Sequence, residues 1–263
     1  MMLAIRAEQM KVFEDAALRS FKEEMLTHLR DFSPPLFKTA GEAQMRAAID
    51  LGISRAATYG FTFRGPVRLY LELMLLFGSH FDTDPQYPWA GQILVDLNFG
   101  SQMQRAEMLY EKTMDYREKV AGPEDNYSLD ALRNIGVFAK TLIDIPQNNF
   151  AAFMLQEISQ LYPQKVAYTG ADALTALIRK GMEGAQRQRF GTARGAALVT
   201  VLMLGFGHGC GNDPLYPWIM KTLKDETITD PDARASRLEK RALTWLEHVL
   251  VNSNASRGLH EQK

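Results

Sequence analysis

Three side chains that can bind a divalent metal ion lie within one short stretch of the sequence. They are His80, Asp82 and Asp84, and imidazole and carboxylate groups are common ligands of such ions. A metal ion held there could activate water for a hydrolytic reaction. A second copy of the same stretch argues against this interpretation, because glycine replaces both His80 and Asp82 in it. We therefore expect no bound metal ion.

A second pair of reactive side chains, His208 and Cys210, lies in the glycine-rich segment 205–211. A histidine can activate a cysteine thiol as a nucleophile, but residues two apart seldom face each other, and no orienting acid is evident. Two ligands without partners at useful spacing also make no zinc site. The glycines follow a predicted helix rather than a strand, so they do not match a dinucleotide-binding fingerprint. We expect a mobile loop that exposes Cys210 and holds no cofactor.

Both loops belong to a motif that occurs twice, at 73–89 and again 129 residues later at 202–218. Glycine allows the preceding helix to end, Asp-Pro forms a turn, and tryptophan anchors the next helix. The motif therefore predicts a structural corner, and any function lies in the residues that differ, 79–83 and 208–212. The positions shared by the two copies include Phe77, Gly78, Asp84, Pro85 and Trp89 in the first and Phe206, Gly207, Asp213, Pro214 and Trp218 in the second.

The composition is typical of a globular protein that interacts with neither nucleic acid nor membrane. The chain has 263 residues and a formal net charge of −1, whereas a nucleic-acid binder needs a strongly cationic surface. The longest apolar run, 196–206, is too short to span a bilayer. One cysteine excludes an internal disulfide, and the N-terminal residues lack the apolar core of a signal peptide. These features predict a cytoplasmic protein.

The positions of apolar residues predict an all-α fold built as an internally duplicated helical bundle. Helices are expected at 2–30, 42–58, 64–77, 89–97 and 101–120, then at 129–145 and 148–161 on either side of Pro146, with a last helix that begins at Asp230-Pro231. We assign residues 1–125 and 126–252 to two pseudo-equivalent units of four to five helices, and 253–263 to a disordered polar tail. The two units are expected to pack as one compact domain around the apolar helix 64–77 and its counterpart.

Charged residues provide candidates for binding a protein partner. Residues 1–130 carry 14 Lys and Arg against 19 Asp and Glu, whereas residues 131–263 carry 16 against 12. Arg179, Lys180, Arg187, Arg189 and Arg194 could meet an acidic surface, although a solvated helix face is the simpler interpretation. The candidate partner-binding residues are His80, Asp82, Asp84, His208, Asn212, Arg187 and Arg189.

A longer pattern resembles a known protein family. It comprises Tyr59-Gly60, Leu69-Tyr-Leu-Glu-Leu-Met74, Phe77-Gly78, Phe81-Asp-Thr-Asp-Pro85 and Pro88-Trp-Ala90, with Ile5-Arg-Ala-Glu-Gln9 and His28-Leu29. This pattern is similar to that of bacterial proteins of unknown activity associated with type VI secretion effectors and Rhs/PAAR polymorphic toxins. The resemblance covers most of the chain and implies a small helical protein that binds a toxin or helps to load it. It implies no catalytic residues, and the chain departs from the family at 64–66, where a charged pair is usual.

These observations favour a non-enzymatic binding protein, most concretely an immunity protein that neutralises a cognate toxin or effector. An effector-loading adaptor or chaperone is the second hypothesis. A small hydrolase or metal-dependent enzyme, using His80, Asp82 and Asp84 or His208 with Cys210, is the alternative from another class. Exposed apolar grooves between the two halves would favour the adaptor, and a rigid charged surface would favour immunity.

Overall fold

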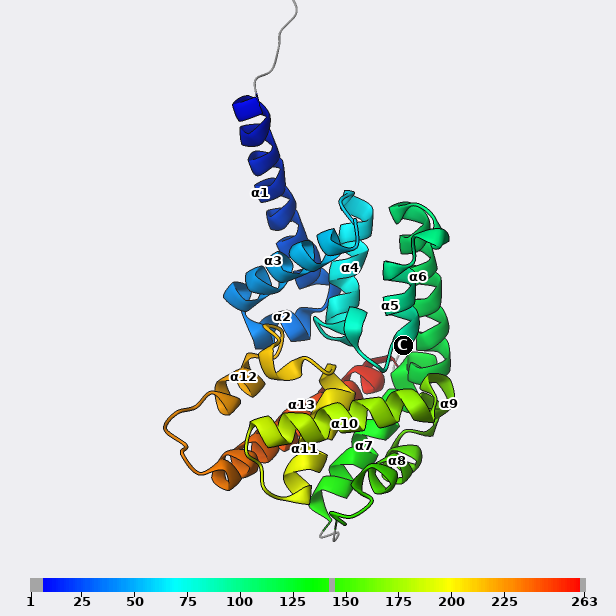
Figure 1. The fold of residues 1–263 in the computed structure, drawn as a ribbon, viewed down its shortest axis with the longest axis vertical. Coiled ribbons are helices and arrows are strands. Elements are labelled where there is room, and N and C mark those ends of the chain that lie inside the picture. Colours follow the sequence, from blue (N-terminus) through cyan, green and yellow to red (C-terminus); the bar gives the residue numbers. More distant parts are fainter. Residues whose placement is uncertain (1–6, 142–144, 261–263) are drawn as a thin grey trace, which may run out of the picture.

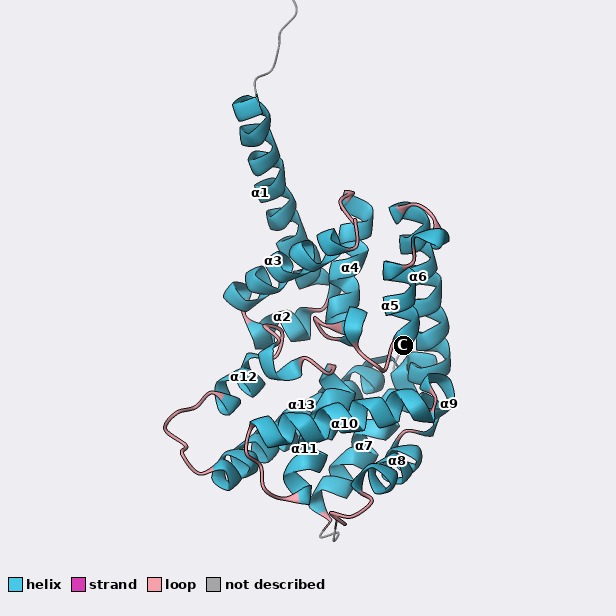
Figure 2. Ribbon diagram, viewed as in Figure 1, coloured by secondary structure: helices cyan, strands magenta, loops and turns pink. Residues whose placement is uncertain are grey.

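The protein is all-helical over the residues that its computed structural model describes, which are 7–141 and 145–260. Its side chains are described for 10–141 and 145–251. Figure 1 shows helices packed around one another, with the N-terminal half of α1 projecting from the body of the molecule. Figure 2 shows helices joined by loops, and the described residues contain no strand. The predicted all-α fold class is confirmed.

The first half of the chain forms six α-helices. Glycine and proline punctuate them, as at Gly41 between α2 and α3 and at Pro88, which begins α5. The predicted capping box is present, because Ser101 and Gln104 exchange hydrogen bonds at the start of α6. The elements are α1 (Ala7–Phe32), α2 (Pro34–Ala40), α3 (Glu42–Thr58), α4 (Arg64–Phe77), the 3₁₀ turn η1 (Phe81–Thr83), α5 (Pro88–Val95), η2 (Leu97–Phe99), α6 (Gln102–Tyr116) and the π-helical turn η3 (Arg117–Ala121).

Most helices of the first half have a counterpart in the second half whose bounds lie 129 residues further on, although η2 has none. Thus α4 begins at Arg64 and its counterpart α11 begins at Ala193. This spacing agrees with the repeat found in the sequence. The elements are η4 (Pro123–Asp125), α7 (Asn126–Lys140), α8 (Phe150–Leu161), α9 (Pro163–Thr169), α10 (Ala171–Arg187), α11 (Ala193–Phe206), η5 (Cys210–Asn212), α12 (Pro217–Leu223) and α13 (Pro231–His260).

Two differences from the predicted helices have local causes. Pro34 and Pro35 were expected only to end the first helix, but they also begin α2, because proline suits the first helical position. The last helix was expected to end before a disordered tail, yet α13 continues to His260. The first residues of the predicted helix 2–30 and the last three residues of the tail lie outside the described residues.

The two repeats differ most in the path of their first long helix. In the first repeat α1 is one continuous helix, and its residues 10–20 are exposed. In the second repeat the helix is interrupted between α7 and α8, as predicted, but α7 ends at Lys140 rather than at residue 145, and residues 142–144 lie outside the described residues. The segment α7 turns back and packs against α13 and η3. Residues 10–20 of α1 therefore extend away from the body of the molecule, whereas α7 of the second repeat packs against it.

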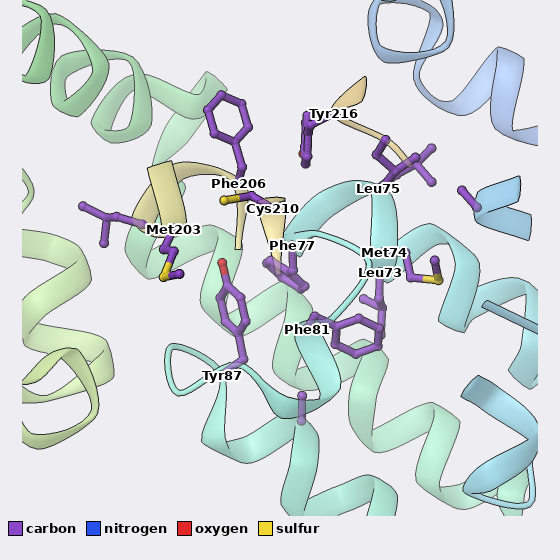
Figure 3. Close-up of a cluster of buried hydrophobic side chains, with 14 of the residues drawn as sticks. Leu73, Met74, Leu75, Phe77, Phe81, Tyr87, Met203, Phe206, Cys210 and Tyr216 are labelled. Atoms are coloured by element: carbon purple, nitrogen blue, oxygen red, sulfur yellow. The ribbon is translucent and has the colours of Figure 1, made fainter. Parts of the chain in front are cut away.

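Buried apolar side chains of both repeats form one continuous cluster. Figure 3 shows its centre, where residues around the end of α4 lie close to residues around the end of α11. We predicted that the repeats would pack around these two helices. They meet instead at the corners that follow them, and α4 packs mainly on α3, α6 and α1.

Candidate functional site

The two Phe-Gly corners are in direct contact through their backbones. Gly78 and Gly207 end α4 and α11 with φ values of 93° and 85°, which side-chain-bearing residues rarely adopt. A Cβ atom on Gly78 would lie 2.5 Å from the carbonyl oxygen of Phe206, and one on Gly207 would lie 2.8 Å from that of Phe77. Both glycines are therefore needed for the approach of the corners, as well as for their own turns.

Two buried aspartates join the corners reciprocally. Asp213 of the second repeat accepts hydrogen bonds from the Ser79 amide at 2.7 Å and from the Ser79 hydroxyl at 2.6 Å. In return, Asp84 of the first repeat accepts one from the His208 amide at 2.6 Å. Each carboxylate also accepts the amide two residues further along its own turn, at 2.9 Å in both repeats. The aspartates thus cap both their own turn and that of the other repeat.

The aromatic residues of the motif pack in the same way in both repeats. Phe77 has Tyr87 and Trp89 as ring neighbours, with centroid distances of 4.6 and 6.0 Å. The Phe206 ring lies 4.7 Å from that of Tyr216 and 5.7 Å from that of Trp218. Such tilted and edge-on pairs are the favoured arrangements of aromatic rings.

Two of the three residues considered as metal ligands, Asp82 and Asp84, have separate protein partners. Asp82 is buried and bonded to the Arg55 guanidinium at 2.5 Å and the Tyr59 hydroxyl at 2.8 Å. Asp84 accepts the hydrogen bonds at the corner that are described above, and His80 is half-buried. Across the described residues, no three His, Cys, Asp or Glu side chains are grouped so that they could hold a metal ion.

The two predicted histidines do come together across the repeats. The rings of His80 and His208 lie 6.1 Å apart, edge to face, and burial together with the nearby Arg55 charge lowers the pKa of His80. Nδ1 of His208 is 3.3 Å from Asp84, but it is not aligned for a hydrogen bond. The imidazole of His80 therefore packs against the second corner, at His208 and Gly209.

Cys210 is buried rather than exposed, so the expectation of an accessible thiol was wrong. It is only 4% exposed, and burial, aided by Asp213 and Asp84, raises its pKa to about 12. A thiol with that pKa remains protonated near neutral pH and is a poor nucleophile. The glycine-rich segment is held by its contacts with the first repeat, which the sequence did not reveal.

The remaining predicted binding residues lie on the surface, and only Asn212 belongs to the corner. Asn212 is exposed at the end of η5. Arg187 and Arg189 are exposed at the end of α10 and in the following turn, before the start of α11, whereas the corner follows its end. The 14 residues of α11 span about 20 Å at the rise of an α-helix. These arginines and the histidines therefore form two separate surfaces.

A buried lysine between the repeats was not among the predicted site residues. Lys165, in α9, is 3% exposed and lines a pocket of about 260 Å³. Its Nζ donates hydrogen bonds to the hydroxyls of Tyr116 at 2.9 Å and Tyr87 at 3.4 Å. The signal was available, because the equivalent position in the first repeat is the apolar residue Leu36. A lysine at a position where the first repeat has leucine indicates that packing alone does not determine the residue there.

Comparisons with known proteins add no family or function to this geometry. No family model, curated protein or solved structure matches the chain. Along the described part of the chain, none of the helices combines the length and apolar character that a membrane span requires.

The cross-repeat hydrogen bonds of Ser79 lead to a stability prediction. Ser79→Ala removes a buried hydroxyl that donates to Asp213, and we expect a loss of about 1–2 kcal/mol in the free energy of unfolding. Thr83→Ala, which removes an exposed hydroxyl in the same loop, should change it by less than about 0.5 kcal/mol. Urea denaturation of both variants measures the difference. Equal effects would show that the Ser79 hydroxyl adds nothing to the contact between the repeats.

Proposed function

We propose that this protein is a non-enzymatic protein-binding module and that the projecting half of α1 contacts the partner. One observation carries the proposal. The apolar face that α1 buries in the body through Phe21, Met25 and Leu29 continues outward through Met10 and Phe13, which are 46% and 65% exposed. A helical face of this kind binds in an apolar groove or against another helix of a partner. Figure 1 shows that this half of α1 stands clear of the other helices.

The fold of the second repeat supports the same inference. There the residues equivalent to the start of α1 belong to α7, and Ala139, the equivalent of the exposed Met10, is half-buried. Met10 is thus exposed to solvent in the first repeat, whereas α7 of the second repeat packs against α13 and η3. Exposed apolar side chains that lie together on one helical face are a common feature of interaction sites in soluble proteins.

The partner that fits the resemblance described above is a secreted bacterial effector or toxin. An exposed apolar stripe favours an adaptor or chaperone, which must hold apolar segments of its cargo, over an immunity protein that masks a site with a charged surface. Two residues that the alternative enzyme would need are not free to react. Asp82, a proposed metal ligand, is bonded to Arg55, and Cys210, the proposed nucleophile, is buried. No observation favours the hydrolase.

The double substitution Met10→Glu with Phe13→Glu tests this assignment. We expect it to abolish copurification with any effector that binds the wild-type protein on co-expression, because two carboxylates would have to be desolvated in the contact. The free energy of unfolding should change by less than about 0.5 kcal/mol, since both side chains are exposed. Val95→Glu is the matched control, because Val95 is 68% exposed on another helix and its substitution should leave binding intact.

Growth of cells that make the effector distinguishes the possible roles. A complex without rescue of growth supports the adaptor, whereas a complex that restores growth supports immunity. A wild-type protein that forms no complex, or whose double variant binds as well as the wild type, would rule out the assignment to α1. Light scattering of the isolated protein adds an independent check, because a dimer that the double variant abolishes would show that a second copy covers α1.

A further inference from the structure

The pocket beside Lys165 combines one buried cation with an apolar wall. It lies where the ends of α4, α6 and η3 meet α7, α9, α11 and α13, so both repeats contribute to it. Arg117 and Asp125 line it as well and are about half exposed, at 50% and 57% of their side-chain surface, which places them toward solvent. The volume of about 260 Å³ gives room for roughly nine water molecules by their share of the liquid volume.

Lys165 is held in place without a carboxylate partner. Its two hydrogen bonds go to Tyr116 and Tyr87, and its Nζ also lies 5.6 and 5.1 Å from the centres of their rings. The described residues form no ion pair with it, and Asp84 acts on it only from a distance. An ammonium group has three protons to donate, and only two of them are used by these hydrogen bonds.

Burial makes the charge of Lys165 costly. The loss of hydration lowers its pKa to about 8, and the distant Asp84 offsets this only in part. The equivalent position of the first repeat holds Leu36, so an apolar residue is compatible with this fold. A buried charge without a partner is a common mark of a binding or catalytic site.

The walls of the pocket show what the rest of a ligand must be. Leu132, Ile135 and Trp245 line it, and the same three residues line a neighbouring, almost wholly apolar pocket of about 90 Å³ between α7, α11 and α13. Small-molecule sites commonly combine such an apolar wall with a single polar group that fixes orientation. The complement of this surface is a molecule with one anionic end and a hydrocarbon chain.

We propose that this pocket binds a medium-chain aliphatic carboxylic acid. Its carboxylate accepts a hydrogen bond from Nζ of Lys165, and its chain packs along Leu132, Ile135 and Trp245 toward the second pocket. The site is independent of the function proposed for α1, which lies on another part of the molecule. Binding of such an acid would hold the two repeats together, because both contribute to the pocket.

Octanoate and its uncharged analogue octan-1-ol are suitable probes for titration calorimetry at pH 7. We expect wild-type protein to bind octanoate at least tenfold more tightly than octan-1-ol, because only the carboxylate pairs with Lys165. Lys165→Met should remove that preference while still binding the alcohol. Lys221→Met, which removes an exposed lysine on α12, is the charge-matched control and should bind octanoate as the wild type does.

A second variant tests the pocket without altering Lys165. Gly205 lines both pockets, a Cβ added to it would meet no atom within 4 Å, and the equivalent residue of the first repeat is Leu76. Gly205→Leu should therefore fold and fill the space, with at least a tenfold loss of octanoate binding. The proposal is overturned if wild-type protein fails to bind octanoate, if it binds both probes equally, or if both variants bind octanoate as the wild type does.

Discussion

Gly78→Ala is expected to lower the free energy of unfolding by on the order of 4 kcal/mol. Two costs add. At φ 93° and ψ 153° the backbone lies in a region that is essentially confined to glycine, and an alanine there costs about 1–3 kcal/mol. The new Cβ would also lie 2.5 Å from the carbonyl oxygen of Phe206, so the two corners would have to separate, at a further cost of about 1–3 kcal/mol.

Gly41→Ala separates these two costs. Gly41 has nearly the same backbone conformation, with φ 84° and ψ 159°, but a Cβ there would meet no atom within 4 Å. It should therefore show only the backbone cost. Gly207→Ala and Gly170→Ala form the equivalent pair in the second repeat, with φ values of 85° and 87°, and should show the same difference. Urea denaturation of the four variants measures it, and equal losses within each pair would mean that the contact between the corners contributes little.

Local signals in the sequence predicted the helices well. Periodic apolar residues and glycine or proline at the ends indicated α3 and α4, whose bounds agree with the prediction. The short helix α2 was missed because Pro34 can end one helix and begin the next. Helix bounds depend on neighbours within a few residues, and those neighbours are visible in the sequence.

The candidate site was less predictable because its contacts join residues far apart in the chain. Comparison of the two copies identified Asp84 and Asp213 as shared positions, yet Asp213 bonds to Ser79, which lies 134 residues away. Cys210 was expected to be exposed because glycines surround it, but the opposite corner buries it. Lys165 resembles any surface lysine until the repeats are packed together. Pairing between distant segments depends on the whole fold, and a local pattern does not contain it.

Lys165→Met is expected to make the protein more stable at pH 7. The pKa of Lys165 is about 8 in the folded protein, compared with a usual value of 10.5. Because the pKa is lower in the folded than in the unfolded protein, Lys165 costs no stability above pH 10.5, where it is neutral in both states. The cost of its charged form develops as the pH falls from 10.5 through 8. At pH 7 the charged lysine should therefore cost about 3 kcal/mol. Methionine removes this cost but leaves the Tyr116 hydroxyl without its partner, so we expect a net gain of about 1–2 kcal/mol.

The dependence on pH identifies the cause of this gain. Between pH 7 and pH 9.5 the cost of the charged lysine should fall by about 2 kcal/mol, since much of Lys165 becomes neutral in the folded state. The advantage of Lys165→Met over wild-type protein should shrink by the same amount, whereas Lys221→Met should show no such trend. Tyrosines that titrate at high pH affect both proteins alike and cancel in the difference.

A gain that stays constant from pH 7 to 9.5 would mean that packing, rather than the buried charge, separates the two proteins. A gain that shrinks as expected would show that the fold retains Lys165 at a cost in stability, as a residue used for binding would be.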